Sequence, residues 1–230
     1  MRARIVIGLA VISLLIGSAD CKKKSADRGR GTASEAAKGW IEVKDADFTG
    51  HDILDAATGA KVGTSSSTQS VVPVPAGTYD VLFGKMPWKG VVVKADETTV
   101  LVPGSLSMTH ATLQGHAVVA ADNGVVQGTL SSMKSNITLV PGRYKVMFGP
   151  LAWPVEVEAG KTAALDPGYL ELAGAGVQGH RIYDATGAEV GEVSNSRSTF
   201  PLPPGAYTID LDGKKAPFTI EIGKPTVLKR

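Results

Sequence analysis

The chain is poor in cysteine and has no apolar run long enough to cross a membrane. Cys21 is the only cysteine among 230 residues, and the apolar run at residues 5–17 is thirteen residues long. A helix needs about 20 apolar residues to span a bilayer, so this run is too short for a stable transmembrane helix. Arg2 and Arg4 precede it, which is typical of a signal peptide. We therefore predict export, with residues 1–20 as the signal peptide.

Signatures of catalysis are missing as well. The sequence has no Gly-x-Ser-x-Gly elbow, no Gly-x-x-x-x-Gly-Lys-Ser/Thr loop and no dinucleotide-binding fingerprint. No pair of carboxylates recurs as glycoside hydrolysis would require. The serines at positions 65, 66, 67, 131, 132, 135, 194 and 196 are interpreted as parts of hydrophilic loops. We expect neither enzymatic activity nor a cofactor, and a metal-dependent or hydrolytic enzyme is the less favoured alternative.

A basic surface is also lacking, although the net charge is +2. Eight of the 24 basic residues but only three of the 22 acidic ones lie within residues 1–38, which leaves 16 basic and 19 acidic residues beyond position 38. Nucleic-acid binding needs a basic face on the folded part. The mildly acidic remainder argues against nucleic acid as a partner.

Processing after the apolar run can follow more than one route. The position of Cys21 resembles that of the lipidated cysteine of bacterial lipoproteins, although Asp20 and Ser18 replace the small and aliphatic residues of such signals. Gly17 and Ala19 also permit ordinary cleavage after Ala19, and an uncleaved anchor is a third alternative. We favour lipidation at Cys21, which would hold the protein at a membrane. Residues 21–38 then form a flexible basic linker, because they have too few apolar side chains to fold alone.

The rest of the chain repeats itself at a spacing of 63–65 residues. The repeated positions comprise an opening glycine, a Gly-His pair, a tyrosine, a later glycine and an aromatic residue. Such a series of matches predicts three copies of one unit, at residues 39–103, 104–167 and 168–230. The matched sets are Gly39, Gly104 and Gly168; Gly50-His51, Gly115-His116 and Gly179-His180; Tyr79, Tyr144 and Tyr207; Gly84, Gly149 and Gly213; and Trp88, Trp153 and Phe218.

Each copy has the alternation of a β-strand. Tyr79, Val81 and Phe83 alternate with other side chains, and the period of two places all three on one buried face. Turn sequences every eight to twelve residues predict six or seven short strands. We therefore predict an all-β protein of three tandem Greek-key sandwiches, Ig-like or prealbumin-like. The tyrosine after each turn is predicted to act as a tyrosine corner.

The third copy carries a recognisable pattern. The segments at residues 184–191 and 200–211 resemble the PEGA-like and carboxypeptidase-regulatory-like β-sandwich modules of bacterial envelope lipoproteins. The resemblance implies a non-catalytic binding module or spacer. We expect it in the cell envelope, anchored at the outer membrane or in the periplasm, and the alternative is a secreted protein. We expect the membrane as a partner through the lipidated N-terminus, and an envelope polysaccharide or another envelope protein as a further candidate partner.

The recurring histidines are the first candidates for a site. His51, His116 and His180 lie in different copies, and no second ligand recurs beside them. A zinc site needs three or four converging ligands. We therefore predict structural histidines at strand starts and no metal, and His110 has no counterpart.

The recurring aromatic residues are the second candidates. Neighbouring prolines indicate that Trp88, Trp153 and Phe218 lie in an edge strand or a loop. These side chains either cover the core or form a platform that binds a sugar, a peptide or peptidoglycan. The sequence leaves both alternatives open.

Overall fold

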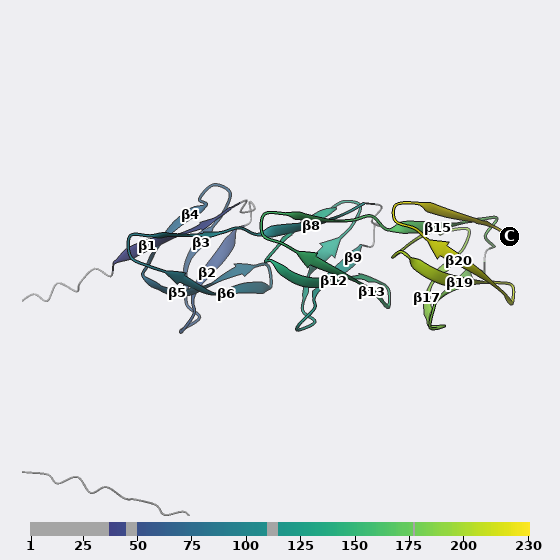
Figure 1. Ribbon diagram of the computed structural model, residues 1–230, viewed down its shortest axis with the longest axis horizontal. Coiled ribbons are helices and arrows are strands. Elements are labelled where there is room, and N and C mark those ends of the chain that lie inside the picture. Colours follow the sequence, from purple (N-terminus) through teal and green to yellow (C-terminus); the bar gives the residue numbers. More distant parts are fainter. Residues whose placement is uncertain (1–36, 45–49, 110–114, 177) are drawn as a thin grey trace, which may run out of the picture. The chain divides into compact units, whose positions relative to one another are not determined.

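The computed structural model describes residues 37–44, 50–109, 115–176 and 178–230, where every regular element is a β-strand (Figure 1). Within these ranges no helix is long and apolar enough to span a membrane. The predicted signal peptide, Cys21, most of the predicted linker and His110 lie outside the described residues.

Seven strands form in each of the three units. The first unit contains β1 (Lys38–Val43), β2 (His51–Asp55), β3 (Lys61–Ser65), β4 (Val71–Pro75), β5 (Gly77–Phe83), β6 (Met86–Val93) and β7 (Thr98–Leu101). The second contains β8 (Gly104–Met108), β9 (His116–Ala120), β10 (Val126–Leu130), β11 (Asn136–Leu139), β12 (Gly142–Phe148), β13 (Leu151–Val157) and β14 (Thr162–Leu165). The third contains β15 (Gly168–Ala173), β16 (His180–Asp184), β17 (Glu189–Val193), β18 (Thr199–Leu202), β19 (Gly205–Leu211), β20 (Lys214–Ile220) and β21 (Pro225–Lys229).

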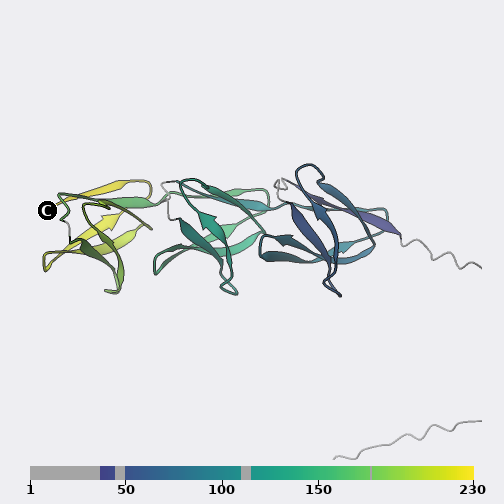
Figure 2. The same ribbon diagram turned by 180° about the vertical axis from the view of Figure 1, so that it is seen from behind.

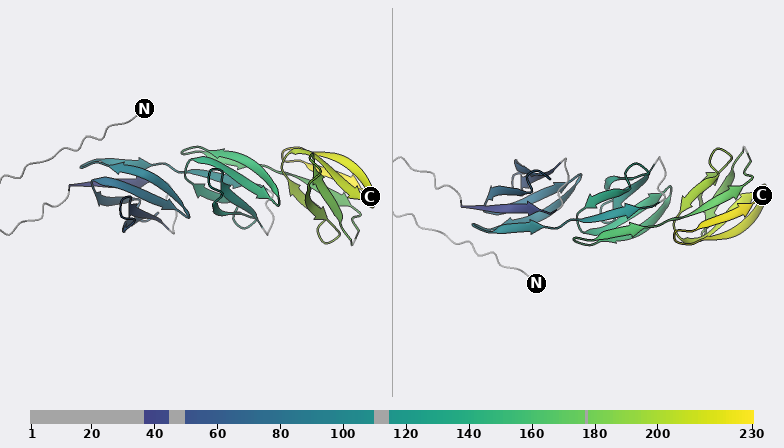
Figure 3. Two further views of the ribbon diagram at one scale, coloured as in Figure 1. Left: turned by 90° about the horizontal axis from the view of Figure 1, so that it is seen from below. Right: turned by 90° about the horizontal axis from the view of Figure 1, so that it is seen from above.

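The strands of each unit form two facing sheets with one topology (Figure 2). In the first unit the orders are β4-β1-β7 and β3-β2-β5-β6, and the other units repeat both orders. β1 runs antiparallel to β4 and parallel to β7, so the first and last strands of the unit are neighbours. The chain passes repeatedly between the sheets, as in a Greek-key sandwich (Figure 3). The predicted all-β fold of three tandem sandwiches is confirmed.

The core of each sandwich follows the predicted alternation. Tyr79, Val81 and Phe83 are all buried, and Ile41 and Val43 face them from the other sheet with no exposed surface. Equivalent residues form the cores of the second and third units. Each such side chain contributes roughly 1.5–3 kcal/mol by leaving water. Alternation in β5, β12 and β19 therefore determines which face of the sheet is buried.

The opening glycine of each unit is required by a close backbone contact. A Cβ built on Gly39, Gly104 or Gly168 would lie 2.2–2.3 Å from a carbonyl oxygen of the strand connection that crosses it. No side chain fits at this distance, so these glycines bring β1, β8 and β15 against the ends of their own units.

The predicted tyrosine corners are present in all three units. The hydroxyl of Tyr79 donates to the Pro75 carbonyl at 2.6 Å, and those of Tyr144 and Tyr207 donate to the fourth residue before them at 2.5 and 2.9 Å. Burial raises the pKa of Tyr144 and of Tyr207 to about 12, so both hydroxyls keep their protons at ordinary pH. The bond ties the turn before each long strand to that strand.

Candidate functional site

The three recurring histidines open equivalent strands and make the same hydrogen bond. The Nδ1 atoms of His51, His116 and His180 lie 3.2, 3.1 and 3.1 Å from the carbonyl oxygens of Leu82, Met147 and Asp210. A carbonyl can only accept, so Nδ1 carries the proton and donates. All three rings are buried, with 2–6% of their surface exposed. Each ring therefore fastens the start of one strand to the end of its neighbour.

The same bond leaves the second ring nitrogen as an acceptor. The Nε2 atoms of His51, His116 and His180 are buried, and no group in the described part of the chain is hydrogen-bonded to them. Leaving a buried acceptor unpaired costs about 1–3 kcal/mol. For His116, burial lowers the pKa, and this outweighs the opposing bond to Met147. Across the described ranges no group of three or more His, Cys, Asp or Glu side chains could hold a metal ion.

Aromatic rings cover the histidine in the first two units. His51 stacks on Phe83 at 4.1 Å between ring centroids, and Trp88 lies 5.8 Å from Phe83. In the second unit His116 lies 4.2 Å from Phe148, and Trp153 lies 6.0 Å from Phe148. Both tryptophans are partly buried against the core. This placement supports a packing role, and ligand binding by these rings stays a prediction.

The third unit departs from the alignment of the aromatic residues. Trp88 and Trp153 are paired in register with Val81 and Val146, which lie two residues after the corner tyrosines Tyr79 and Tyr144. Phe218 is paired instead with the corner tyrosine itself, Tyr207. The position equivalent to the two tryptophans, opposite Ile209, is occupied by Ala216. The interpretation that Trp88, Trp153 and Phe218 share one position is therefore wrong. Phe218 is 7% exposed and its ring is 5.7 Å from that of Tyr207.

The turn that follows each long strand also differs in the third unit. Gly84 and Gly149 open this turn with φ of 60° and 59°. In the third unit Asp212 takes that place with φ of 56°, and Gly213 is the second turn residue. Gly84, Gly149 and Gly213 are therefore not equivalent. An aspartate in this left-handed conformation costs about 1 kcal/mol relative to glycine.

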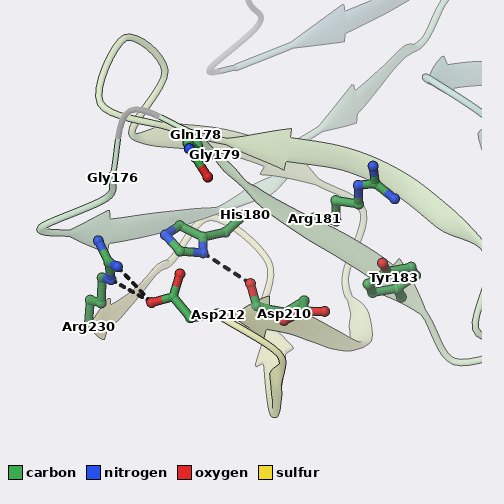
Figure 4. Close-up of a pocket in the computed structure, with 9 residues that line it drawn as sticks. All are labelled: Gly176, Gln178, Gly179, His180, Arg181, Tyr183, Asp210, Asp212 and Arg230. Carbon is green, nitrogen blue, oxygen red and sulfur yellow. Dashed lines mark hydrogen bonds and ion pairs between the residues drawn. The ribbon is translucent and has the colours of Figure 1, made fainter.

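One of these departures, Asp212, lines a polar cavity of about 370 Å³ in the third unit (Figure 4). Cavities of about 440 and 240 Å³ lie beside His51 and His116 in the other two units. β16 supplies His180, Arg181 and Tyr183, while the β19–β20 turn supplies Asp212. In Figure 4 His180, Asp212 and Arg230 lie together on one side and Tyr183 lies on the other. The Nε and Nη2 atoms of Arg230 donate to Oδ2 of Asp212 at 2.9 and 2.7 Å.

The charged groups of the cavity are largely matched. Asp212 is paired with Arg230, and the Asp210 carboxylate accepts the Gly213 N–H at 2.6 Å. Arg181 lies 3.7 Å from the carboxylate of Glu189 outside the cavity. The lining residues Arg181, Arg230, Asp210 and Asp212 carry two charges of each sign. The cavity therefore presents donors and acceptors without an excess of positive charge.

The predicted sites and this cavity overlap only in His180. Cys21 lies outside the described residues, and the predicted aromatic residues do not line the cavity. Asp212 and Arg230 were not predicted as site residues. The one available signal in the sequence was that an aspartate, Asp212, directly precedes Gly213, the glycine aligned with Gly84 and Gly149.

No family model matches the chain, and no curated protein matches it. Two similar solved structures are the Bacillus anthracis TIE protein and an assembly intermediate of the E. coli P pilus tip, PapC-PapD-PapK-PapG. The first is 18% identical with a TM-score of 0.23, and the match covers 84% of this chain and 50% of that one. The second is 13% identical with a TM-score of 0.21, and covers 70% of this chain and 22% of that one. The matches thus span half or less of these two chains, and likenesses this weak carry no functional argument.

Proposed function

We propose that the chain is an exported envelope protein, tethered by a lipid on Cys21, that acts without catalysis as a binding or spacer protein. The observation that carries this proposal is how the recurring polar side chains are used. In each unit the histidine fastens two strands and the tyrosine hydroxyl ties down a turn. The groups shared by all three units thus hold the fold together, which suits a module that presents surfaces.

The tether rests on the sequence of the N-terminal segment. An apolar run behind two arginines, followed by Cys21 and a polar stretch, favours export with lipidation. A single acyl chain gives only marginal membrane binding, whereas several chains on one cysteine hold a protein firmly. The three sandwiches would then be displayed from the membrane on the linker at residues 21–38.

The experiment is fractionation of cells that produce the full precursor or its Cys21→Ala variant. We expect the unsubstituted protein in the membrane fraction, with a mature mass that includes the lipid, and the variant in the soluble exported fraction. An unchanged distribution and an unchanged mature mass would refute lipidation at Cys21. The variant leaves the sandwiches untouched, so circular dichroism of the purified protein is the control for folding.

Sugar binding through the aromatic residues is the second candidate. Trp88 and Trp153 keep part of their surface exposed, whereas Phe218 is buried. Any platform of this kind would therefore rest on the two tryptophans of the first and second units.

A further inference from the structure

A cavity lies beside the recurring histidine in each of the three units, and the one beside His180 differs from the other two in the residues around it. The stacking phenylalanine is replaced by Leu211, the tryptophan by Ala216 and the turn glycine by Asp212. The first two changes remove aromatic rings from the neighbourhood of the histidine. The third change adds the carboxylate of Asp212, which has an unfavourable positive φ. Of the three replacements only Asp212 lines the cavity, and it places a carboxylate where the cavities beside His51 and His116 have Gly84 and Gly149.

The groups around the cavity define what would complement them. The Nε2 atom of His180 is an acceptor without a partner among the described residues, so it calls for a donor. One carboxylate oxygen of Asp212 pairs with Arg230, which leaves its other oxygen as an acceptor. Arg230 and Arg181 contribute only donors, and Gln178 contributes both donors and an acceptor. A ligand group that both donates and accepts, such as a hydroxyl, fits this mixture.

Charge argues against the simplest ionic ligands. An anion would need excess positive charge, but Asp212 and Glu189 already pair with the two arginines. A cation would need an unpaired carboxylate, but Asp212 is paired and Asp210 is bonded to the turn. A neutral ligand avoids the cost of breaking these pairs.

We propose that this cavity binds one ring of a neutral saccharide. The inference rests on the proposed function as a binding protein and names the ligand class and the site. A volume of about 370 Å³ lies at the small end of the range of ligand sites, which suits a single ring. Ring hydroxyls bond to Asp212 and Arg230 at the mouth of the cavity.

His180 provides the deepest contact in this arrangement. A Cβ built on Gly176 would lie 2.8 Å from Nη1 of Arg230 and 3.9 Å from Nε2 of His180, so Gly176 borders both groups. Nε2 has almost no accessible surface, whereas the Arg230 side chain is 44% exposed. A ligand hydroxyl that lies between Gly176 and the Arg230 guanidinium is therefore next to Nε2, and the Arg230–Asp212 pair is kept.

The test is a titration of the full mature chain followed by NMR of the imidazole nitrogens. The probes are glucose, galactose, mannose and N-acetylglucosamine, with sodium sulfate and zinc chloride as ionic probes. We expect at least one sugar to shift the His180 Nε2 resonance selectively, with a dissociation constant of the order of 1 mM. The resonances of His51 and His116 are internal controls, because their rings have the same local bonds and lie beside cavities that have Gly84 or Gly149 in place of Asp212.

Two variants assign the binding to the cavity. Asp212→Gly restores the glycine of the other units and should weaken sugar binding about tenfold or more. Asp96→Gly is the matched control, since Asp96 also has positive φ (59°) but lies in the first unit, and it should bind as the unsubstituted chain does. Gly176→Ala narrows the cavity and should also weaken binding.

Three outcomes would overturn the proposal: no sugar shifts His180, a sugar binds equally well to the Asp212→Gly variant, or sulfate or zinc occupies the cavity in place of the sugars. None of them bears on lipidation or display, because Cys21 fractionation is measured independently. A failed sugar titration with a membrane-bound precursor would thus refute the ligand and retain the tethered spacer.

Discussion

Truncation of the recurring aromatic side chains distinguishes core packing from a ligand platform. Phe218 is 7% exposed, so Phe218→Ala removes a full core side chain and should lower the free energy of unfolding by about 3–5 kcal/mol. Trp153 is partly buried, with its ring centroid 6.0 Å from that of Phe148. About half of the full effect, roughly 2 kcal/mol, is expected for Trp153→Ala. Trp88→Ala should behave like Trp153→Ala, because the two residues share their register.

The assay is urea denaturation of the mature chain, followed by far-ultraviolet circular dichroism and by fluorescence. Trp40 remains as a fluorophore in both tryptophan variants. For a unit of this size a loss of 2 kcal/mol corresponds to a fall in Tm of roughly 10 °C, which scanning calorimetry would detect. The packing argument is refuted if Trp153→Ala changes stability by less than about 0.5 kcal/mol and removes retention on a polysaccharide. The reverse result leaves the tryptophan as a core lid.

Three further measurements test the shared framework. Tyr144→Phe leaves the Val140 carbonyl without its donor and should cost about 1–2 kcal/mol in urea denaturation; no loss would contradict the tyrosine corner. Burial lowers the pKa of His116 below its usual value of 6.5, so the unfolded state takes up the proton at a higher pH than the folded state does. The free energy of unfolding should therefore fall as the pH drops below about 6.5, by at most ~1.4 kcal/mol per pH unit. His116→Gln should flatten this slope, and an unchanged slope would contradict a buried, neutral His116. Gly104→Ala places a Cβ 2.3 Å from a backbone oxygen and should cost well over 2 kcal/mol, whereas Gly124→Ala, in open space at φ of 72°, should cost about 1 kcal/mol; equal effects in calorimetry would refute the close contact.

The fold could be predicted from the sequence because its determinants are local and occur three times. Alternation in Tyr79, Val81 and Phe83 follows from the period of two in a strand. The Asp55 turn is equally local, since the Oδ1 atom of Asp55 accepts the N–H groups of Ala57 and Thr58 at 3.1 and 2.8 Å. Each such signal was present in several copies, and each copy supported the others.

The register of the last hairpin could not be predicted, for a definite physical reason. Sequence comparison aligned Phe218 with Trp88 because both follow a proline and both are aromatic. A shift of two residues keeps a side chain on the same face of a strand, so the hydrophobic pattern is identical in both alignments. Only the pairing with Tyr207 distinguishes them.

The cavity could not be predicted from the sequence for another reason. Asp212 and Arg230 are 18 residues apart and meet only because β19, β20 and β21 return the chain to the same end of the unit. No motif links an aspartate in a turn to an arginine after a later strand. His180 could be selected from the sequence as a recurring residue, but its distinctive surroundings depend on side chains that do not recur.

Replacing Asp212 tests whether a residue that differs between the three units contributes to stability. Asp212→Gly removes an ion pair whose side chains are 44% and 60% exposed, which is worth at most about 1 kcal/mol. The same change relieves a residue at φ of 56°, which returns about 1 kcal/mol. The free energy of unfolding should therefore stay within about 1 kcal/mol of its original value, and Asp96→Gly, with φ of 59°, should give a small gain. A loss above 2 kcal/mol on Asp212→Gly would make the aspartate a structural residue. A neutral result would mean that folding does not require the carboxylate beside His180, so that its part in ligand binding is decided by the sugar titration alone.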